Sequence, residues 1–133
     1  MKVLVCGSRT INDPAVVSQA IEQSGIRPTS IISGGARGVD RLAGEYAASH
    51  GIEFTEYLAD WDRFGKRAGF LRNYVMVGEA DAVIAVWDGK SSGTKHAIDT
   101  AISSGKQVFV YQHRSSGAEV AAASATGTSI FRN

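Results

Sequence analysis

Cysteine and long apolar runs are both scarce in this chain of 133 residues. The single cysteine, Cys6, cannot form an intrachain disulfide, so nothing in the sequence indicates an oxidising compartment. The apolar run near the N-terminus, residues 3–6, is too short for the core of a signal peptide and far too short to cross a membrane. We therefore expect a cytoplasmic protein that has no membrane partner.

Charge of one sign is not in excess either. The chain has 14 Lys and Arg residues against 13 Asp and Glu residues, a net charge of +1, which argues against nucleic acid as a partner. His, Cys and acidic residues do not occur at the spacings of a metal site, so neither a metal nor another cofactor is expected. What is present is the composition of a globular domain, with 44% hydrophobic and 20% charged residues, in a length typical of one domain.

Short apolar or β-rich segments alternate along the chain with helical patterns. Continuous apolar strands are typical of a sheet that helices cover on both faces. The alternation indicates right-handed crossovers, and therefore an α/β fold with a Rossmann-like, doubly wound sheet of about five parallel strands. By analogy with other doubly wound folds, we expect the strand order 3-2-1-4-5. The expected strands are residues 3–6, 30–32, 53–57, 82–86 and 107–111, and the expected helices are residues 14–21, 39–47, 71–76 and 97–102.

The C-terminal segment, residues 114–133, has a different composition. It is rich in Ser, Ala, Gly and Thr, and its only bulky apolar residues are Ile130 and Phe131. We therefore divide the chain into a domain over residues 1–113 and a C-terminal tail. This segment is expected to be either a mobile tail or an arm that packs on a partner subunit.

Each of the first four expected strands is followed by a segment rich in glycine, hydroxyl groups or charges. Ligands of open α/β sheets bind outside the carboxyl ends of the strands, where the strand order reverses. Two of these segments, residues 33–38 and 91–94, precede a helix, so backbone N–H groups and the helix dipole can together bind a phosphate there. The alternative is that such segments are only tight connections between a strand and a helix.

Most basic residues of the chain fall in or just after these segments, and Arg pairs bidentately with phosphate. We expect Arg9, Arg37 and Arg72 to bind the ligand. Trp61 and Trp87 can stack on a base, although core packing is the alternative for Trp87. The expected ligand-binding residues are Gly7, Ser8, Arg9, Ser33, Gly34, Gly35, Arg37, Gly38, Asp40, Trp61, Arg72, Asn73, Trp87, Ser91, Ser92, Gly93 and Thr94.

The motifs in these segments together resemble those of the SLOG superfamily. This group includes the DNA-processing protein DprA and the Lonely Guy cytokinin-activating phosphoribohydrolases, and the chain is most similar to its short YspA-type members. The resemblance covers the chain up to Tyr111 and implies a Rossmann-like fold that binds a nucleotide or nucleotide-derived ligand, in a homodimer. The motifs are residues 33–40 (Ser-Gly-Gly-Ala-Arg-Gly-Val-Asp), 59–61 (Ala-Asp-Trp), 68–73 (Ala-Gly-Phe-Leu-Arg-Asn), 80–81 (Ala-Asp) and 92–94 (Ser-Gly-Thr).

The resemblance also implies roles for individual residues. Lonely Guy enzymes hold the phosphate with two glycine-rich stretches, which residues 34–38 match here together with Gly93 and Thr94. Arg72 matches their catalytic arginine, but Asn73 stands where they have a lysine.

The catalytic glutamate of those enzymes has no counterpart after the Gly-Thr pair, because this chain has no acidic residue there before Asp99. Cleavage of an N-glycosidic bond builds positive charge on the ribose, which a nearby carboxylate stabilises. In an enzyme of this kind, Arg72 would act with a carboxylate supplied from another segment, by Asp60, Asp88 or Asp40.

The first hypothesis is a module that binds a phosphorylated nucleotide-like ligand, to sense or sequester it. The alternative is an N-glycosidase or nucleoside 5′-monophosphate phosphoribohydrolase, and the sequence leaves open whether the ligand is turned over. Single-stranded DNA binding, by analogy with DprA, is disfavoured by the near-neutral charge. A NAD(P)-dependent dehydrogenase is disfavoured because residues 7–10 do not form a G-x-G-x-x-G turn.

Overall fold

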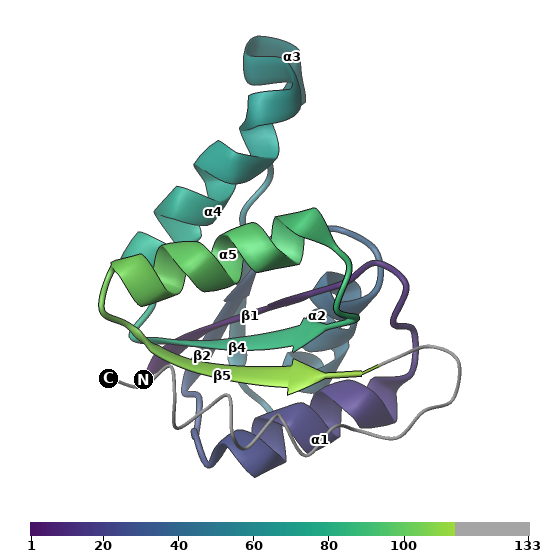
Figure 1. Ribbon diagram of the computed structural model, residues 1–133. Coiled ribbons are helices and arrows are strands. Elements are labelled where there is room, and N and C mark those ends of the chain that lie inside the picture. The colour runs from purple at the N-terminus through teal and green to yellow at the C-terminus, as the bar shows by residue number, and fades with distance from the viewer. Residues whose placement is uncertain (114–133) are drawn as a thin grey trace.

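A computed structural model describes residues 1–113, and residues 114–133, with the expected tail or arm, lie outside the described residues. The five described strands form a parallel sheet in the order β3-β2-β1-β4-β5 (Figure 1), which confirms the predicted fold and strand order. The strands are β1 (Lys2–Gly7), β2 (Ser30–Ser33), β3 (Glu53–Glu56), β4 (Ala82–Trp87) and β5 (Gln107–Gln112). The helices are α1 (Pro14–Ser24), α2 (Val39–Ser49), α3 (Trp61–Phe64), the 3-10 helix η1 (Gly65–Arg67), α4 (Ala68–Glu79) and α5 (Ser92–Ser103).

Helices α1 and α2 cover one face of the sheet, and α4 and α5 cover the other (Figure 1). Side chains of a strand point alternately to the two faces, so a strand covered on both sides must be apolar at every position. Val3 and Val5 of β1 belong to the core on the α1–α2 face, whereas Leu4 and Cys6 belong to the core on the α4–α5 face. Burial on both faces therefore explains the uninterrupted apolar runs of the sequence.

Local sequence signals set the ends of the helices. The Asp13 carboxylate accepts a hydrogen bond from the Ala15 N–H where α1 begins, and α1 ends at Gly25, whose φ of 72° is favourable only for glycine. Ser91 caps α5 in the same manner, by accepting from the Thr94 N–H. Helix α5 thus begins at the same edge of the sheet where the ligand was expected to bind. No helix within residues 1–113 combines the length and the apolar character needed to cross a bilayer.

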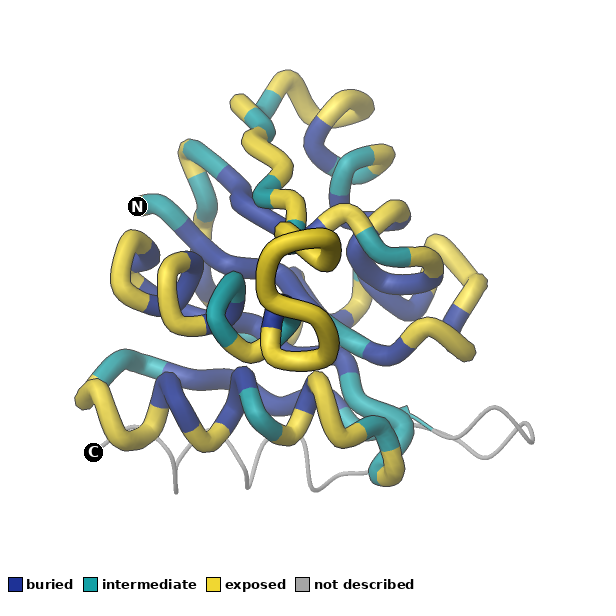
Figure 2. The backbone as a smooth tube through the Cα atoms, turned by 90° about the horizontal axis from the view of Figure 1, so that it is seen from above, coloured by how far each residue is buried: buried dark blue, intermediate teal, exposed yellow. Residues whose placement is uncertain are grey.

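The segment between β3 and α4 forms an arm, α3 and η1, that projects from the body of the domain (Figure 1). Every residue of the arm is exposed, as the view from above shows (Figure 2). The sequence pattern predicts a helix after the third strand only over residues 71–76, so the short helix α3 is a feature that the structure adds. Asp60 caps that helix by accepting a hydrogen bond from the Arg63 N–H at 3.2 Å.

Candidate functional site

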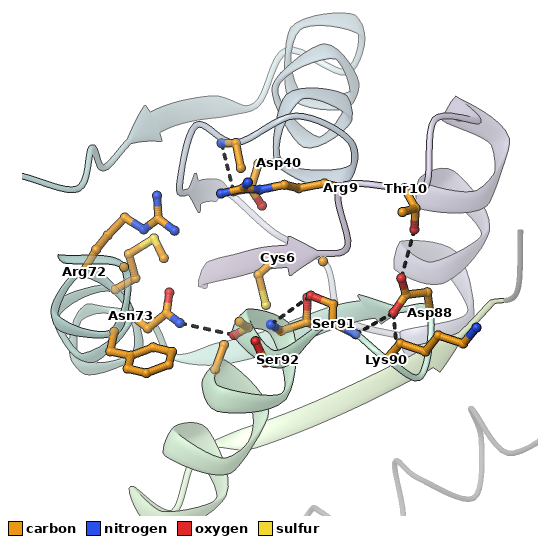
Figure 3. Close-up of a pocket in the computed structure, with 18 of the residues that line it drawn as sticks. Cys6, Arg9, Thr10, Asp40, Arg72, Asn73, Asp88, Lys90, Ser91 and Ser92 are labelled. Atoms are coloured by element: carbon orange, nitrogen blue, oxygen red, sulfur yellow. Dashed lines mark hydrogen bonds between the residues drawn. The ribbon is translucent and has the colours of Figure 1, made fainter. Parts of the chain in front are cut away.

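A cavity of about 700 Å³ opens at the carboxyl edge of the sheet, where the strand order reverses between β1 and β4 (Figure 3). It is lined by four parts of the chain: the end of β1 with the loop after it, the start of α2 with the loop before it, the arm with α4, and the β4–α5 loop with the start of α5. This is where the doubly wound topology predicts a ligand.

The structure brings more than half of the expected site residues to this cavity. Those that line it are Gly7, Arg9, Asp40, Trp61, Arg72, Asn73, Asp88, Ser91, Ser92, Gly93 and Thr94. Those that do not line it are Ser8, Ser33, Gly34, Gly35, Arg37, Gly38, Asp60 and Trp87.

The β4–α5 loop is fixed by the carboxylate of Asp88. This side chain accepts hydrogen bonds from the N–H groups of Lys90 and Ser91, both at 2.8 Å, and from the Thr10 hydroxyl at 2.9 Å. Burial alone would raise the pKa of Asp88, but these hydrogen bonds outweigh burial and hold the pKa below its ordinary value. Asp88 is therefore an ionised group whose oxygens are engaged in holding the loop.

The first turn of α5 presents hydrogen-bond donors to the cavity. The Thr94 N–H is already bonded to the Ser91 hydroxyl oxygen at 3.4 Å, and the two hydroxyl groups lie 3.1 Å apart. The N–H groups of Ser92 and Gly93 precede the hydrogen-bond ladder of the helix and so remain available to a ligand. A Cβ added at Gly93 would meet no atom of residues 1–113 within 4 Å, so open space faces this residue.

The glycines of the β2–α2 loop serve the packing of the protein itself. Gly38 has a φ of 72°, and a Cβ there would lie 2.7 Å from the Arg9 Cα and would clash with the Ser8 carbonyl oxygen. Gly35 has a φ of 80°, and a Cβ there would clash with the Glu56 carboxylate. Gly38 therefore requires glycine whether or not a ligand binds, whereas at Gly35 the positive φ favours glycine and the flexible Glu56 side chain can move aside.

Other residues of the β2–α2 loop are likewise turned from the cavity. Ser33 is buried and donates a hydrogen bond to the Val5 carbonyl at 2.8 Å. Arg37 is exposed and lies outside the cavity wall. Within residues 33–38, only Ala36 lines the cavity.

Helix α4 supplies two polar side chains to the site. The Nη1 atom of Arg72 donates to the Gly34 carbonyl at 2.7 Å, while its buried Nε atom has no hydrogen-bond partner among residues 1–113. Leaving a buried donor without a partner costs about 1–3 kcal/mol. The Asn73 side chain is buried, and its amide nitrogen donates to the Gly93 carbonyl at 3.3 Å and to the His96 Nδ1 at 3.2 Å, which joins α4 to α5.

Asp40, in the first turn of α2, is a buried carboxyl group beside Arg9 in the cavity wall (Figure 3). Only 6% of the residue is exposed, and Oδ2 accepts from the Ala36 N–H at 3.1 Å. Burial raises the pKa of Asp40 by more than the Ala36 N–H and the charges of Arg72 and Arg9 lower it. Asp40 is therefore more basic than an ordinary carboxylate and, unlike Asp88, is not fully engaged by hydrogen bonds.

The charge of the cavity wall is predominantly positive. Two acidic side chains of the described chain line it, Asp40 and Asp88. They are outnumbered by four basic side chains, and within residues 1–113 none of these four forms an ion pair with an acidic residue. Free cations around a concave wall suit an anionic ligand. The basic residues are Arg9, Lys66, Arg72 and Lys90.

Two expected residues, Asp60 and Trp87, have structural contacts instead. Asp60 caps α3, as described above. The Trp87 indole N–H donates to the Ser91 carbonyl at 3.0 Å, and its ring packs against the core on the α4–α5 face. This fits the core-packing alternative for Trp87, whereas Trp61 lies in the cavity wall.

Comparison with known proteins agrees with the resemblance seen in the motifs. A family model described as YAcAr, the YspA, cpYpsA-related SLOG family, matches residues 1–64. The Gene 61 protein of Mycobacterium phage D29 is 37% identical over an alignment of 117 positions, which covers 81% of this chain and 94% of that protein. The chain belongs to the SLOG superfamily. No solved structure matches it. Membership of SLOG associates the domain with nucleotide-related ligands or glycosidase-like chemistry, without naming a ligand.

Sequence reasoning missed several residues of the SLOG cavity. Some sit next to expected residues in the chain, and Lys66 and Lys90 belong to the basic residues that cluster after the strands. Phe70 lies within the motif that contains Arg72, so its position was a signal that could have been used. The missed residues are Cys6, Thr10, Ala36, Lys66, Gly69, Phe70, Met76, Lys90 and Ala97.

Two features of this SLOG cavity bear on its chemistry. Burial raises the pKa of the Cys6 thiol far above neutral pH, so Cys6 remains a thiol and is not a reactive nucleophile. Within residues 1–113, no three His, Cys, Asp or Glu side chains gather closely enough to hold a metal ion.

Proposed function

We propose that this protein binds a phosphorylated nucleotide-like ligand in the cavity at the carboxyl edge of the sheet, as a module that senses or sequesters it. One observation carries the proposal: four basic side chains surround a single cavity, and within residues 1–113 none of them forms an ion pair with an acidic side chain. An anion that bears more than one charge, such as a phosphate group, would neutralise this excess.

The start of α5 supports the same ligand class. The free N–H groups of Ser92 and Gly93 and the helix dipole favour an oxyanion at this point. Because Asp88 and the Ser91 cap already hold the loop, little conformational entropy is lost when a phosphate binds. Arg72 of α4 also lines the cavity and adds a charged guanidinium to its wall.

Isothermal titration calorimetry with AMP, GMP, NAD and ADP-ribose tests this function. We expect at least one of them to bind, and Arg72→Ala to weaken its binding by about tenfold or more. Arg41→Ala removes an exposed arginine that does not line the cavity, and should bind as the wild type does. If no phosphorylated compound binds, or if Arg72→Ala folds and binds normally, the proposal is wrong.

A second candidate function, hydrolysis of an N-glycosidic bond, is favoured by Asp40. Of the three acids weighed from the sequence, Asp60 lies outside the cavity and Asp88 is engaged by hydrogen bonds. Asp40 lines the cavity, is buried, and has a raised pKa. A buried, more basic carboxylate is suited to act as a general base.

In that reaction Asp40 takes a proton from a water molecule whose oxygen forms a bond to C1′ of the ribose. The bond from C1′ to the base nitrogen breaks, and its electron pair leaves with the base. The leaving nitrogen takes a proton from solvent and Asp40 returns its proton to solvent, so that one water is consumed and a free base and a ribose phosphate are formed. Arg72 would hold the phosphate of the substrate.

Chromatography of nucleotides after incubation with the purified protein distinguishes the two functions. Base released by wild type, and reduced about 100-fold or more in Asp40→Asn while binding survives, would establish the enzyme. Asp60→Asn changes a carboxylate outside the cavity and is the matched control. If a nucleotide binds but no base is released, the binding function stands and the hydrolase function is wrong.

Two expectations about partners remain predictions. Light scattering would test the homodimer implied by the resemblance. A DNA titration at several salt concentrations would test single-stranded DNA binding, which predicts an affinity that falls steeply with salt.

A further inference from the structure

Two aromatic side chains stand exposed in the wall of the cavity at its arm and α4 side. Trp61 of α3 is 49% exposed and Phe70 of α4 is 44% exposed, and both line the cavity. Large aromatic side chains left in contact with water at a concave site are typical of a surface that a ligand or partner covers. The same cavity holds cations that form no ion pair within residues 1–113, so it has an apolar part and a charged part.

Neighbouring residues hold both aromatic rings in place. The Phe70 ring stacks on the His96 imidazole, with ring centroids 4.2 Å apart and planes 22° apart. The Asn73 amide nitrogen can only donate, so His96 Nδ1 accepts the bond between them and the imidazole is neutral, in keeping with its pKa, which burial lowers. Trp61 of the arm lies against Gly69 of α4, since a Cβ added at Gly69 would lie 3.3 Å from the indole ring.

We propose that Trp61 and Phe70 form the subsite for the planar aromatic base of the ligand, on the arm and α4 side of the same cavity whose cations and α5 N-terminus hold its phosphate. This inference rests on the proposed function, because it assigns the second end of a ligand whose first end is the phosphate. Stacking on an aromatic side chain contributes to affinity for every base, since all bases have a π face. The subsite therefore favours ligands that carry a planar base over ligands without one, and it distinguishes adenine from guanine only weakly.

The position of the subsite fits the shape of such a ligand. Arg72 and Asn73 of α4 lie toward one end of the cavity, and Asp88 and Lys90 lie toward the other (Figure 3). Phe70 is on the α4 side, since its stacking partner His96 bonds to Asn73. A compound with a phosphate, a ribose and a base extends across a cavity of this kind, whereas an isolated phosphate would leave the aromatic side empty.

Calorimetry on the full chain tests the subsite with three probes: AMP, GMP and ribose 5-phosphate, which lacks a base. Wild type should bind AMP and GMP with affinities within about tenfold of each other, and both at least about fivefold more tightly than ribose 5-phosphate. Trp61→Leu and Phe70→Leu should each weaken AMP binding about fivefold or more, with no change for ribose 5-phosphate.

Phe64→Leu is the matched control. Phe64 lies on the same arm and is 40% exposed, close to the exposure of Phe70, but it does not line the cavity and instead has the Arg63 guanidinium over its ring at 5.1 Å. This variant should bind AMP as wild type does. All three changes replace exposed side chains, so the variants are expected to fold, and circular dichroism checks that they do.

The outcomes separate this inference from the proposed function. If AMP binds but Trp61→Leu and Phe70→Leu bind it normally, the aromatic subsite is wrong and the phosphate site stands. If ribose 5-phosphate binds as tightly as AMP and GMP, the subsite is wrong in the same way. If none of the three probes binds, the inference is overturned together with the nucleotide ligand.

Discussion

The β2–α2 loop and the β4–α5 loop lie at the same edge of the sheet, and both contain glycine. Of the two, only the β4–α5 loop contributes most of its residues to the cavity, with Asp88, Lys90 and Ser91, and the first turn of α5 adds Ser92, Gly93 and Thr94. In the β2–α2 loop, Gly35 and Gly38 leave room for Glu56 and for the backbone of the β1–α1 loop. In contrast, Gly93 in the first turn of α5 faces open space, although Gly89 of the β4–α5 loop has a φ of 85° and lies against the Gln112 side chain.

This difference shows that glycine in a βα connection has two physical meanings. A missing side chain gives room either to a ligand or to the protein's own backbone, and the one-dimensional pattern is the same in both cases. The carboxylates of the two loops differ as well. Asp88 is engaged by hydrogen-bond donors that hold its loop, whereas Asp40, at the end of the other segment, is buried with few partners.

The largest expected effect comes from adding one methyl group at Gly38 of the β2–α2 loop, compared with one at Gly93 in the first turn of α5. Gly38→Ala combines a positive φ with a Cβ only 2.7 Å from the Arg9 Cα, so it should lower the free energy of unfolding by about 3 kcal/mol or more. Gly93→Ala meets no atom of residues 1–113 within 4 Å and should change it by less than about 0.5 kcal/mol. Urea unfolding measures both. Equal losses would remove the distinction between the loops.

The two carboxylates should give stability a pH dependence of opposite sign. The folded pKa of Asp40 lies above its ordinary value of 3.8, so ionisation of Asp40 costs stability as pH rises from 3.8 through the folded pKa. The folded pKa of Asp88 lies below 3.8, so Asp88 contributes stability above pH 3.8 that is lost as pH falls through the folded pKa.

At pH 7, Asp40→Asn should therefore be more stable than wild type, since the amide oxygen still accepts from the Ala36 N–H. Asp88→Asn should be less stable, by about 1–3 kcal/mol, because hydrogen bonds to a charged acceptor are lost. Unfolding free energies between pH 3 and pH 8 provide the comparison. A shift of both variants in the same direction at pH 7 would contradict it.

Removing one basic side chain from each loop tests the same contrast in ligand binding. Lys90 of the β4–α5 loop lines the cavity, whereas Arg37 of the β2–α2 loop is exposed outside it. Lys90→Ala should weaken AMP binding about threefold to tenfold, and Arg37→Ala should leave the affinity unchanged. Calorimetry at low salt is the suitable measurement. A loss of affinity in Arg37→Ala would restore the phosphate role that the sequence predicted for that loop.

The smallest effect concerns the link between the β1–α1 loop and Asp88. The Thr10 hydroxyl donates to Asp88 at 2.9 Å, so Thr10→Val should lower the free energy of unfolding by about 0.5–1.5 kcal/mol. Thr10→Ser keeps the hydroxyl and should restore most of the stability. If Thr10→Val and Thr10→Ser have the same stability in thermal unfolding, this hydrogen bond does not help to hold the β4–α5 loop.

The sequence by itself determined the fold and the edge of the sheet at which the cavity lies. Continuous apolar runs such as residues 82–86 required a sheet covered on both faces, and the alternation with helices required parallel strands. In such a sheet the carboxyl ends meet at one edge, so Arg9, Arg72 and the β4–α5 loop were expected near one another before any coordinates. These features follow from local periodicity and chain topology.

Only the tertiary structure decided how each candidate residue is used. Whether a glycine faces a ligand or a neighbouring backbone depends on contacts between segments far apart in the chain, as for Gly38 and Arg9. The pKa of a carboxyl group depends on burial and on the donors around it, which is why Asp40 and Asp88 differ. Phe70 lines the cavity because α4 packs on α5 through Asn73 and His96. No short sequence motif specifies such packing between helices.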